Sequence, residues 1–473
     1  MTVSLVSHLQ QLQKQVPSPP VVAAGKLIRG IGLTLEAVGC QLPVGSQCMV
    51  QTIDGEIEAE VVGFGDHITY LMPTEAVRGI VPGSRVLPLN RDSGLSVGLG
   101  MLGRVVDGNG LPLDGLGPIE STERVPTTKP PINPLARRTI AEPMDVGVRA
   151  INAITTVGVG QRMGLFAGSG VGKSVLLGMM TRGAKADVVV VGLVGERGRE
   201  VKEFIHDILT EEERQRAVVV AAPADTSPLM RLKGCETAVT IAEYFRDKGM
   251  KVLLLIDSLT RYAQAQREIA LATGEPPATK GYPPSVFSRL PQLVERAGNG
   301  SGNGVSVTAI YTVLVEGDDL NDPIADSARA ILDGHIVLSR EIAEQAIYPA
   351  VDIQASVSRS MAAVVDQSHL RSALKVKQLY ARYQQSRDLI NVGAYVIGAD
   401  KITDLAVSCQ PAIEAFLTQS HDESVSFDQS VSALTAILAD ASDGYVDEGQ
   451  HEDASFVSES SSSHIDPVVA NNV

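Results

Sequence analysis

The chain has 473 residues, of which 44% are hydrophobic, and its formal net charge is −15 at pH 7. This length exceeds one ordinary hydrophobic core, so we expect two or three domains. The apolar runs at 188–194 and 252–256 are too short to cross a bilayer and read as buried strands, and the N-terminus lacks the apolar core of a signal peptide. The four scattered cysteines favour a reducing cytoplasm over a disulfide framework.

The negative charge is concentrated at the C-terminal end. Residues 421–473 hold eleven acids and no Lys or Arg, so the rest of the chain carries only −4 of the −15. A nearly neutral body lacks the basic footprint that is typical of proteins that bind nucleic acids, and we expect no nucleic-acid partner.

The first 92 residues predict a short helix, a linker and a small β domain. Residues 2–16 place apolar residues on one helical stripe, and the prolines within 17–20 end that helix, so residues 1–20 form a helix and a linker. The stripe either packs on its own domain or binds a partner, and the proline linker favours a partner. Residues 21–92 are short β-prone runs separated by Gly and turn residues, which indicates a small barrel.

Strands and helices alternate from about residue 150, which is typical of a mostly parallel sheet with crossover helices. We therefore assign residues 93–364 to an α/β nucleotide domain, with a connector rich in Pro and Gly at 107–134. Such sheets bind ligands at the carboxyl ends of their strands. The expected strands are 162–167, 187–194, 216–222, 251–256, 305–314 and 335–340.

The C-terminal region predicts a helical domain at 365–440. Helical periodicity runs through 368–389 and 401–419, and a third helix is expected at about 427–440. Residues 441–473 are acidic and rich in Ser, which is typical of a disordered tail. The apolar residues expected to face inward from the third helix are Val431, Leu434, Ile437 and Leu438.

A phosphate-binding loop is the motif around which the nucleotide domain is organised. An apolar strand runs into a glycine-rich loop that opens a helix, and Ala167 to Ser174 matches the pattern small-x-x-x-x-Gly-Lys-Ser. Backbone N–H groups and the helix N-terminus bind phosphates in such loops, while Lys173 would contact the outer phosphates of ATP and Ser174 would ligate Mg²⁺. The residues expected to bind the nucleotide here are Gly168, Ser169, Gly170, Val171, Gly172, Lys173, Ser174 and Val175.

Two acids follow strands of the same predicted sheet. Asp257 closes an apolar run, as a Walker-B acid does, and we expect it to hold Mg²⁺ opposite Ser174. Glu196 follows the strand at 187–194 and is our candidate for the residue that orients or deprotonates the attacking water. From the residues alone, Asp257 could also be an ordinary strand end, and Glu196 an ordinary acid in a charged turn.

Together these motifs resemble the catalytic subunits of rotary ATP synthases and their relatives in protein export, and the resemblance extends from the start of the chain to about residue 440. Two further segments resemble the type III secretion and flagellar ATPases, and the second of these is most similar to flagellar export ATPases. The segments that carry the family resemblance are 164–174 (GLFAGSGVGKS), 195–200 (GERGRE), 257–261 (DSLTR) and 349–358 (PAVDIQASVS). The segments that carry the branch are 276–287 (PPATKGYPPSVF) and 321–335 (NDPIADSARAILDGH).

The resemblance implies roles that the residues alone do not establish. Glu196 would be the catalytic carboxylate, and Arg197 would lie close to the phosphates. Tyr348 would stack on adenine, and Arg359 would reach the neighbouring subunit's site as an arginine finger. Without the resemblance, Tyr348 reads as a core residue and Arg359 as a surface charge.

The resemblance also implies an architecture, an activity and partners. The expected fold is an N-terminal β-barrel, a RecA-like α/β nucleotide domain and a C-terminal helical domain, assembled as a homohexamer that hydrolyses ATP in flagellar protein export. The expected partners are a stator-like regulator at the N-terminal helix, a stalk-like coiled-coil protein, export substrates with their chaperones, and the membrane export gate, with which the protein would associate peripherally.

Three alternatives stay open at this point. An injectisome ATPase would share the chemistry and export other cargo. A non-catalytic nucleotide-binding subunit is a second alternative, although such relatives usually lack the carboxylate at the position of Glu196. An RNA-translocating hexamer would need aromatic platforms and a basic groove, and the barrel segment offers only Phe64 and Tyr70 as aromatic residues.

Overall fold

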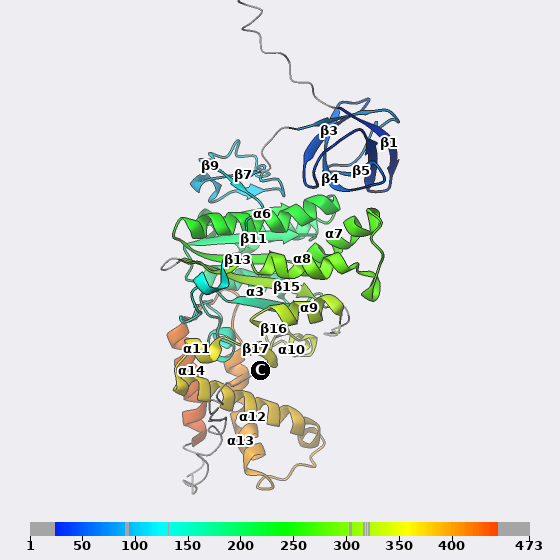
Figure 1. Cartoon of the computed structure of the whole chain (residues 1–473). Helices are drawn as coiled ribbons and strands as arrows, with labels where there is room; N and C mark the ends of the chain where they lie inside the picture. The colour runs from blue at the N-terminus through cyan, green and yellow to red at the C-terminus, as the bar shows by residue number, and fades with distance from the viewer. Residues whose placement is uncertain are drawn as a thin grey trace, which may run out of the picture.

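The computed structural model describes residues 24–89, 94–130, 132–301, 305–315, 317, 319 and 322–442. The expected helix at 2–16 and the tail from residue 443 onward lie outside the described residues. A β-barrel, a layer of sheet and helices, and a group of C-terminal helices follow one another along the molecule (Figure 1). This order confirms the expected architecture. Within the described part of the chain, no helix is long and apolar enough to cross a membrane.

The N-terminal barrel closes through six strands in the order β1-β2-β5-β4-β3-β6, and all neighbours are antiparallel. Successive side chains of a strand point to opposite faces, so Val50, Val61, Leu71 and Val86 fill the interior and are fully buried. Closure pairs every strand on both sides and confirms the predicted barrel. The strands are β1 (Gly25–Ile31), β2 (Thr34–Val38), β3 (Gln47–Gln51), β4 (Glu56–Gly65), β5 (Ile68–Pro73) and β6 (Arg85–Pro88).

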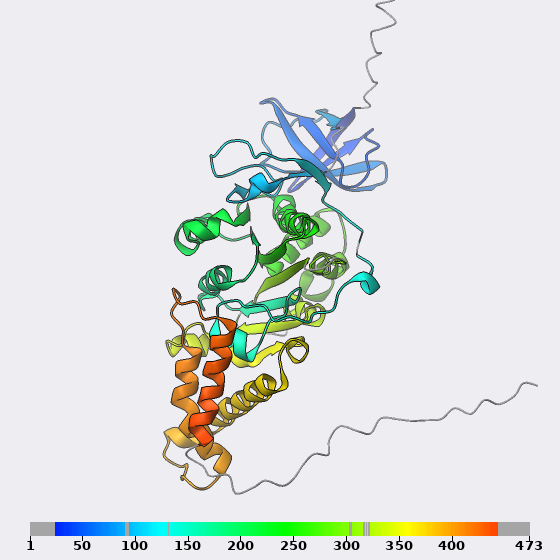
Figure 2. The ribbon, with the colours of Figure 1, turned by 90° about the vertical axis from the view of Figure 1, so that its left-hand side faces the viewer.

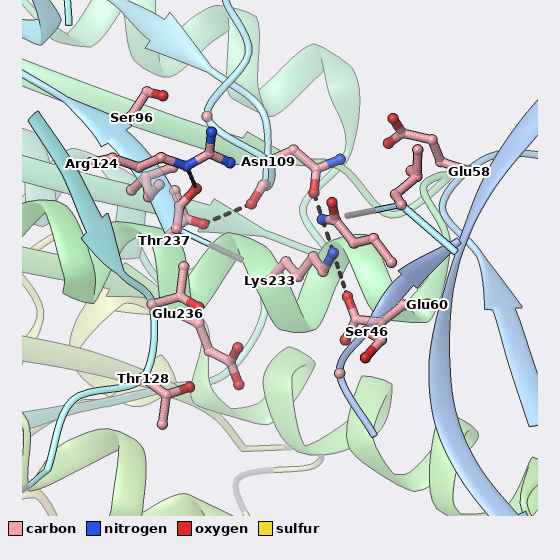
Figure 3. A pocket seen from close by; sticks show the side chains of 18 of the residues that line it. Ser46, Glu58, Glu60, Ser96, Asn109, Arg124, Thr128, Lys233, Glu236 and Thr237 are labelled. Carbon is pink, nitrogen blue, oxygen red and sulfur yellow. Dashed lines mark hydrogen bonds and ion pairs between the residues drawn. The ribbon is translucent and has the colours of Figure 1, made fainter. Parts of the chain in front are cut away.

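Helix α6 (Pro228–Asp247) joins the nucleotide domain to the barrel. Nζ of Lys233 on this helix lies 2.5 Å from Glu60 of β4 and 3.4 Å from Oδ1 of Asn109 (Figure 3). A cavity of about 660 Å³ surrounds this contact, and none of the described residues that line it is among those predicted to bind nucleotide. The cavity therefore belongs to the junction between the two domains and is separate from the predicted phosphate site.

The central sheet has the order β17-β16-β10-β15-β13-β11-β12-β8, and β14 (Gly298–Asn299) pairs with β15. The pairs from β16 to β8 are parallel, whereas β17 runs antiparallel to β16. The six predicted strands are confirmed to within two residues, but β17 and the short β8 are additional. The strands are β8 (Val105–Val106), β10 (Arg162–Ala167), β11 (Val188–Val194), β12 (Ala217–Ala222), β13 (Lys251–Asp257), β15 (Ser306–Leu314), β16 (Gly334–Leu338) and β17 (Val351–Ser358).

The segment predicted as a connector also contains regular structure. Strand β9 (Glu123–Pro126) lies within 107–134 and pairs with β7 (Gly94–Val97) in a separate two-stranded sheet. The sequence did not indicate β9 because its four residues include two charges and a proline, and only pairing with a distant strand makes it a strand.

Helices cover both faces of the central sheet (Figure 2). Alternation along the strands sends Leu165 and Leu253 into a core shared with α2, α3 and the C-terminal helices, and sends Phe166 and Leu254 into a core shared with α6 to α9. The helices of this domain are α2 (Arg149–Ile154), α3 (Lys173–Gly183), α4 (Gly198–Glu203), α5 (Glu211–Gln215), α7 (Leu259–Ala272), α8 (Pro284–Val294), α9 (Pro323–Ile331), α10 (Arg340–Glu344) and α11 (Met361–Val364). Short 3₁₀ turns cover Leu99–Met101, Pro134–Ala136 and Thr279–Gly281, and a π-helical turn covers Phe204–Ile208.

Three helices form the C-terminal part: α12 (Gln367–Asn391), α13 (Lys401–Leu417) and α14 (Phe427–Ser442). They confirm the helices predicted at 368–389, 401–419 and 427–440. On α14, Leu434 and Ile437 are buried, and Val431 and Leu438 are half-buried, so the predicted stripe faces the core. This core is continuous with the one under β10 and α3, which ties the C-terminal helices to the nucleotide domain.

We predict that Leu434→Ala destabilises the protein by about 2–5 kcal/mol, because Leu434 is fully buried and its truncation leaves a cavity. Leu389→Ala is the matched control on α12, since Leu389 is 54% exposed and should cost much less. Guanidinium titration followed by circular dichroism measures both. Equal losses in the two variants would contradict the burial of this face of α14.

Candidate active site

The phosphate loop connects the carboxyl end of β10 to the first turn of α3. Gly170 and Gly172 have φ angles of 79° and 91°, which residues with a Cβ rarely adopt, and Gly172 is the N-cap residue of the helix. No side chain of the described residues caps α3, so its first backbone N–H groups are available to phosphate oxygens. The loop therefore has the conformation that its motif predicts.

Lys173 lies between the two predicted acids. Its Nζ is 2.6 Å from Oδ1 of Asp257 and 3.0 Å from Oε1 of Glu196. The side chains of Lys173 and Glu196 are each 11% exposed and that of Asp257 is 4% exposed. Three residues that the sequence marked separately thus meet at one point, although 23 and 84 positions separate the acids from the lysine.

The order of the strands explains this meeting. Asp257 ends β13, and Glu196 follows β11, which pairs with β13. Strand β15 lies between β13 and β10, and its Thr312 donates a hydrogen bond of 2.6 Å to Oδ1 of Asp257. The motifs did not reveal Thr312, and the sequence does not distinguish it, because Ser306, Thr308 and Tyr311 of the same strand also carry hydroxyl groups. Thr312 holds the Asp257 carboxylate in place beside Lys173.

The charges of the three residues depend on one another. Burial by itself lowers the pKa of Lys173, but the charges and hydrogen bonds of Asp257 and Glu196 outweigh burial and raise the pKa above its usual value. Burial also raises the pKa of the Asp257 carboxyl, against the opposing influence of Lys173 and Thr312. Removal of either acid would leave the buried ammonium partly uncompensated.

A cavity of about 590 Å³ lies beside the phosphate loop, next to Tyr348. The ring of Tyr348 is so close to the loop that a Cβ at Gly172 would lie 3.8 Å from ring atom Cδ1, and Tyr348 is 46% exposed. An exposed aromatic ring next to a phosphate loop suits a stacked base. The cavity is lined by Val171, Gly172, Val175, Leu176, Met179, Leu338, Ala346, Tyr348, Pro349, Ala350, Thr418, Gln419, Ser420 and His421.

The loop between α13 and α14 closes one side of this cavity. The backbone N–H of Gln419 donates to the carbonyl of Tyr348 at 2.8 Å. The Gln419 side chain accepts from the N–H of Arg149 and donates to the carbonyl of Gly147, each at 2.8 Å. The motifs did not reveal this wall, because it comes from a segment about 70 positions after Tyr348 with no signature of its own. The C-terminal helices therefore complete the pocket beside the phosphate loop.

Arg359 lies near the amino ends of the parallel strands, whereas the phosphate loop lies at their carboxyl ends. In the register of β16 and β17, Leu338 pairs with Val351 and Gly334 pairs with Ser358, while Leu338 also pairs with Ala167 at the start of the phosphate loop. Val351 therefore lies at the level of the phosphate loop, and Ser358 lies at the level of Gly334, four residues or roughly 13 Å back along β16. Arg359 is exposed there, and it is not joined to the Lys173 cluster of its own chain.

The remaining predicted residues lie at the same edge as the loop without joining the Lys173 cluster. The Arg197 side chain is 84% exposed and pairs with Glu200 at 3.3 Å. Ser169 and Val175 are exposed on the loop and the first turn of α3, and Ser174 is half-buried.

Together, the phosphate loop, the two acids at the carboxyl edge of a parallel sheet and the adjacent aromatic pocket define a P-loop nucleoside triphosphatase. Family models give the same class: the nucleotide-binding domain of the ATP synthase alpha/beta family matches residues 147–358. The T3SS EscN ATPase C-terminal domain matches residues 365–436.

Comparison with individual proteins narrows the class. The chain is 61% identical to a flagellum-specific ATP synthase of Pseudomonas aeruginosa over 428 residues, which are 90% of this chain and 95% of the relative. The Salmonella typhimurium flagellum-specific ATP synthase is 56% identical, with 93% and 99% covered. A type 3 secretion system ATPase of Xanthomonas euvesicatoria is 46% identical, with 88% and 94% covered.

A solved structure gives the same result at the level of the fold. The assembled ATPase EscN of the enteropathogenic E. coli type III secretion system superimposes with a TM-score of 0.84 at 43% identity, covering 88% of this chain and all of that one. The chain belongs to the family of flagellum-specific ATP synthases and is an ATP hydrolase. The resemblance seen in the motifs is thereby confirmed.

We predict that Lys173→Ala and Glu196→Gln fail in different ways. Loss of the Lys173 charge should raise the dissociation constant of ATP roughly ten- to hundredfold, because the lysine contacts phosphates in the ground state. Glu196→Gln should lower kcat by about 10²–10⁴ and leave ATP affinity nearly unchanged, because the amide keeps its shape but cannot take a proton.

Equilibrium binding and phosphate release measure the two effects, and Glu203→Gln, at a glutamate of α4 whose side chain is 41% exposed, is the control. Equal losses of ATP affinity in Lys173→Ala and Glu196→Gln would contradict the assignment.

Proposed function

We propose that the chain hydrolyses ATP to drive or initiate the export of flagellar proteins through a type III export apparatus. The observation that carries the proposal is the contact of the phosphate-loop Lys173 with Asp257 and Glu196. The flagellar cargo is favoured over injectisome cargo because the flagellar relatives reach 61% and 56% identity, against 46% for the type 3 secretion system ATPase.

The contact suggests how the residues act when ATP enters. The phosphates take positions at the N-terminus of α3, and Lys173 exchanges its acidic partners for the outer phosphates. Glu196 then loses its cation and is free to orient and deprotonate the attacking water. Phosphoryl transfer requires an aligned nucleophile and compensation of charge, and little covalent help from the protein.

The same residues fit a magnesium ion. The Ser174 hydroxyl and the Asp257 carboxylate are the oxygen donors that Mg²⁺ prefers, and such sites use one or two protein ligands beside water and phosphate. When bound, Mg²⁺ neutralises charge on the phosphate oxygens. Among the described residues no group of three or more His, Cys, Asp or Glu forms a metal site of another kind.

The position of Arg359 supports a ring, and we propose a homohexamer. The site at the carboxyl edge of the sheet has no cation beyond Lys173 in contact with its acids among the described residues, while Arg359 is exposed at the other edge. A head-to-tail ring would place Arg359 of one subunit against the phosphate loop of the next. Tyr348 would stack on the adenine, and Arg197 would approach the phosphates. EscN, the structural relative, is described as assembled.

The partners follow from the same family. The EscN structure is also known in complex with its central stalk EscO, and we propose a stalk-like coiled-coil partner for this chain. A stator-like regulator at the N-terminal helix, export substrates with their chaperones at the C-terminal domain, and peripheral association with the membrane export gate complete the proposal.

Gene deletion in the host tests the cargo. Loss of flagellar filaments with effector secretion intact, restored by the wild-type gene and not by Glu196→Gln, is the expected result. Loss of effector secretion with filaments intact would assign the chain to an injectisome.

We predict that Arg359→Ala lowers kcat by about 10³–10⁵ and that mixing it with Lys173→Ala restores part of the activity. In mixed rings, a subunit with an intact loop can sit beside a subunit with an intact Arg359. Phosphate release from rings of verified composition measures the recovery, and each variant alone is the control. No recovery would show that Arg359 does not act across subunits.

We predict that deletion of residues 2–16, or Leu9→Asp, breaks the complex with the regulator and leaves ATP hydrolysis nearly intact. An isolated helix this short is marginal in water, so its apolar stripe requires a surface to bind. A pull-down measures binding to the regulator, and a phosphate-release assay measures hydrolysis, with Gln11→Ala as the control for both. Binding of the deletion variant to the regulator with wild-type affinity would contradict the prediction.

A further inference from the structure

We propose that Asp333, held by Arg162, is a positioning residue for Arg359. The inference rests on the proposed function of Arg359 as an arginine finger. It concerns the amino edge of the sheet, away from the phosphate loop, where the chain passes from α9 into β16 and from β17 into α11.

Arg162 and Asp333 form a two-pronged ion pair with two additional hydrogen bonds that involve the backbone. Nε of Arg162 donates to Oδ2 of Asp333 at 2.9 Å, and its Nη2 donates to Oδ1 at 3.1 Å. The backbone N–H of Arg162 also donates to Oδ2 at 3.1 Å, and the N–H of Asp333 donates to the carbonyl of Arg162 at 2.9 Å. Four hydrogen bonds thus fix Asp333 against the first residue of β10, the strand that leads into the phosphate loop.

Asp333 in turn holds the backbone of Arg359. Its carbonyl accepts the N–H of Arg359 at 3.0 Å and Nε2 of Gln161 at 2.9 Å. The same Nε2 atom lies 3.1 Å from Oγ of Ser358, and that hydroxyl donates to the carbonyl of Thr156 at 2.7 Å. The position from which the Arg359 side chain starts is therefore set by contacts to β10 and to the segment before it.

Beyond this anchored backbone, the side chain itself is little constrained. Its Nη2 donates to the carbonyl of Arg329 at 3.2 Å, and the residue is exposed. A side chain that acts on a neighbour's substrate needs a fixed backbone and a free end, because a misplacement of about 1 Å can cost roughly a hundredfold in rate. The ion pair of Arg162 and Asp333 fixes the backbone of Arg359.

Arg104 and Asp114 offer a matched pair elsewhere in the chain. Nε and Nη2 of Arg104 donate to the two Asp114 oxygens at 2.7 and 2.8 Å, and the N–H of Val105 donates to Oδ2 of Asp114 at 3.0 Å. The two-pronged contact matches that of Arg162 and Asp333, although Arg162 also contacts Glu295 at 2.5 Å and Nη2 of Arg104 also donates to the carbonyl of Gly117. No bond to Arg359 follows from the Arg104–Asp114 pair. Asp114→Asn therefore reports what the loss of such a pair costs in stability alone.

The test uses full-length assembled protein carrying Asp333→Asn, Asp114→Asn, Arg359→Ala or both Asp333→Asn and Arg359→Ala. We expect Asp333→Asn to lower kcat by about ten- to hundredfold with ATP affinity within about twofold, and Asp114→Asn to leave both nearly unchanged at a similar loss of thermal stability. The double variant should be no slower than Arg359→Ala alone, since a positioning residue has nothing left to position. Asp333→Asn should also regain activity when mixed with Lys173→Ala.

The outcomes separate the inference from the proposal beneath it. Normal turnover of Arg359→Ala would contradict the proposed role of Arg359 as an arginine finger, and with it the proposal on which the inference rests. Loss of turnover in Arg359→Ala with normal turnover in Asp333→Asn, or additive losses in the double variant, would overturn the positioning role alone. If Asp333→Asn does not assemble, Arg162→Lys, which keeps the charge and removes the fork, replaces it. Failure of both to assemble would assign the ion pair to stability and overturn the inference.

Discussion

The ammonium group of Lys173 is the charge on which the site depends. It is nearly buried, and two carboxylates compensate it in the absence of phosphate. A buried cation with such partners is stable, whereas one without them would destabilise the fold or lose its proton. The acids that neutralise the lysine are also the acids that we propose for activation of water and binding of metal. In the proposed mechanism, entry of a nucleotide exchanges one set of negative charges for another and leaves Glu196 and Asp257 available for water and metal.

The sheet separates the two halves of the proposed chemistry. The parallel strands bring the phosphate loop, Glu196 and Asp257 to their carboxyl ends. The antiparallel β17 carries the chain from the pocket beside the phosphate loop to the amino ends of these strands, where Arg359 lies. A single subunit cannot bring both edges together, because the strands between them are rigid and hydrogen-bonded. This geometry gives a physical reason for the assembly of such chains as rings.

The C-terminal helices take part in the site as well as in the core. The loop after α13 bonds to Tyr348 and to the segment around Gly147, so one wall of the pocket beside the phosphate loop belongs to the domain that is most distant from the barrel (Figure 1). Occupancy of the pocket and the position of these helices are thus connected by direct hydrogen bonds. If adenine stacks on Tyr348 as proposed, the bonds of Gln419 provide a short physical path between the nucleotide and the C-terminal domain.

The sequence by itself determined the phosphate loop, six strands of the central sheet and the C-terminal helices, because each of these depends on local periodicity, on glycine conformation or on a motif of adjacent residues. It also indicated Asp257 and Glu196 by their places at strand ends. Only the tertiary structure decided that both acids contact Lys173, that Thr312 holds Asp257 and that Gln419 closes one side of the pocket next to Tyr348. The strand order, with β15 between β10 and β13, is fixed by hydrogen bonds between segments far apart in the chain. No local pattern encodes that order. For the same reason, only the paired strands reveal that Asp333 contacts both Arg162 and the backbone of Arg359.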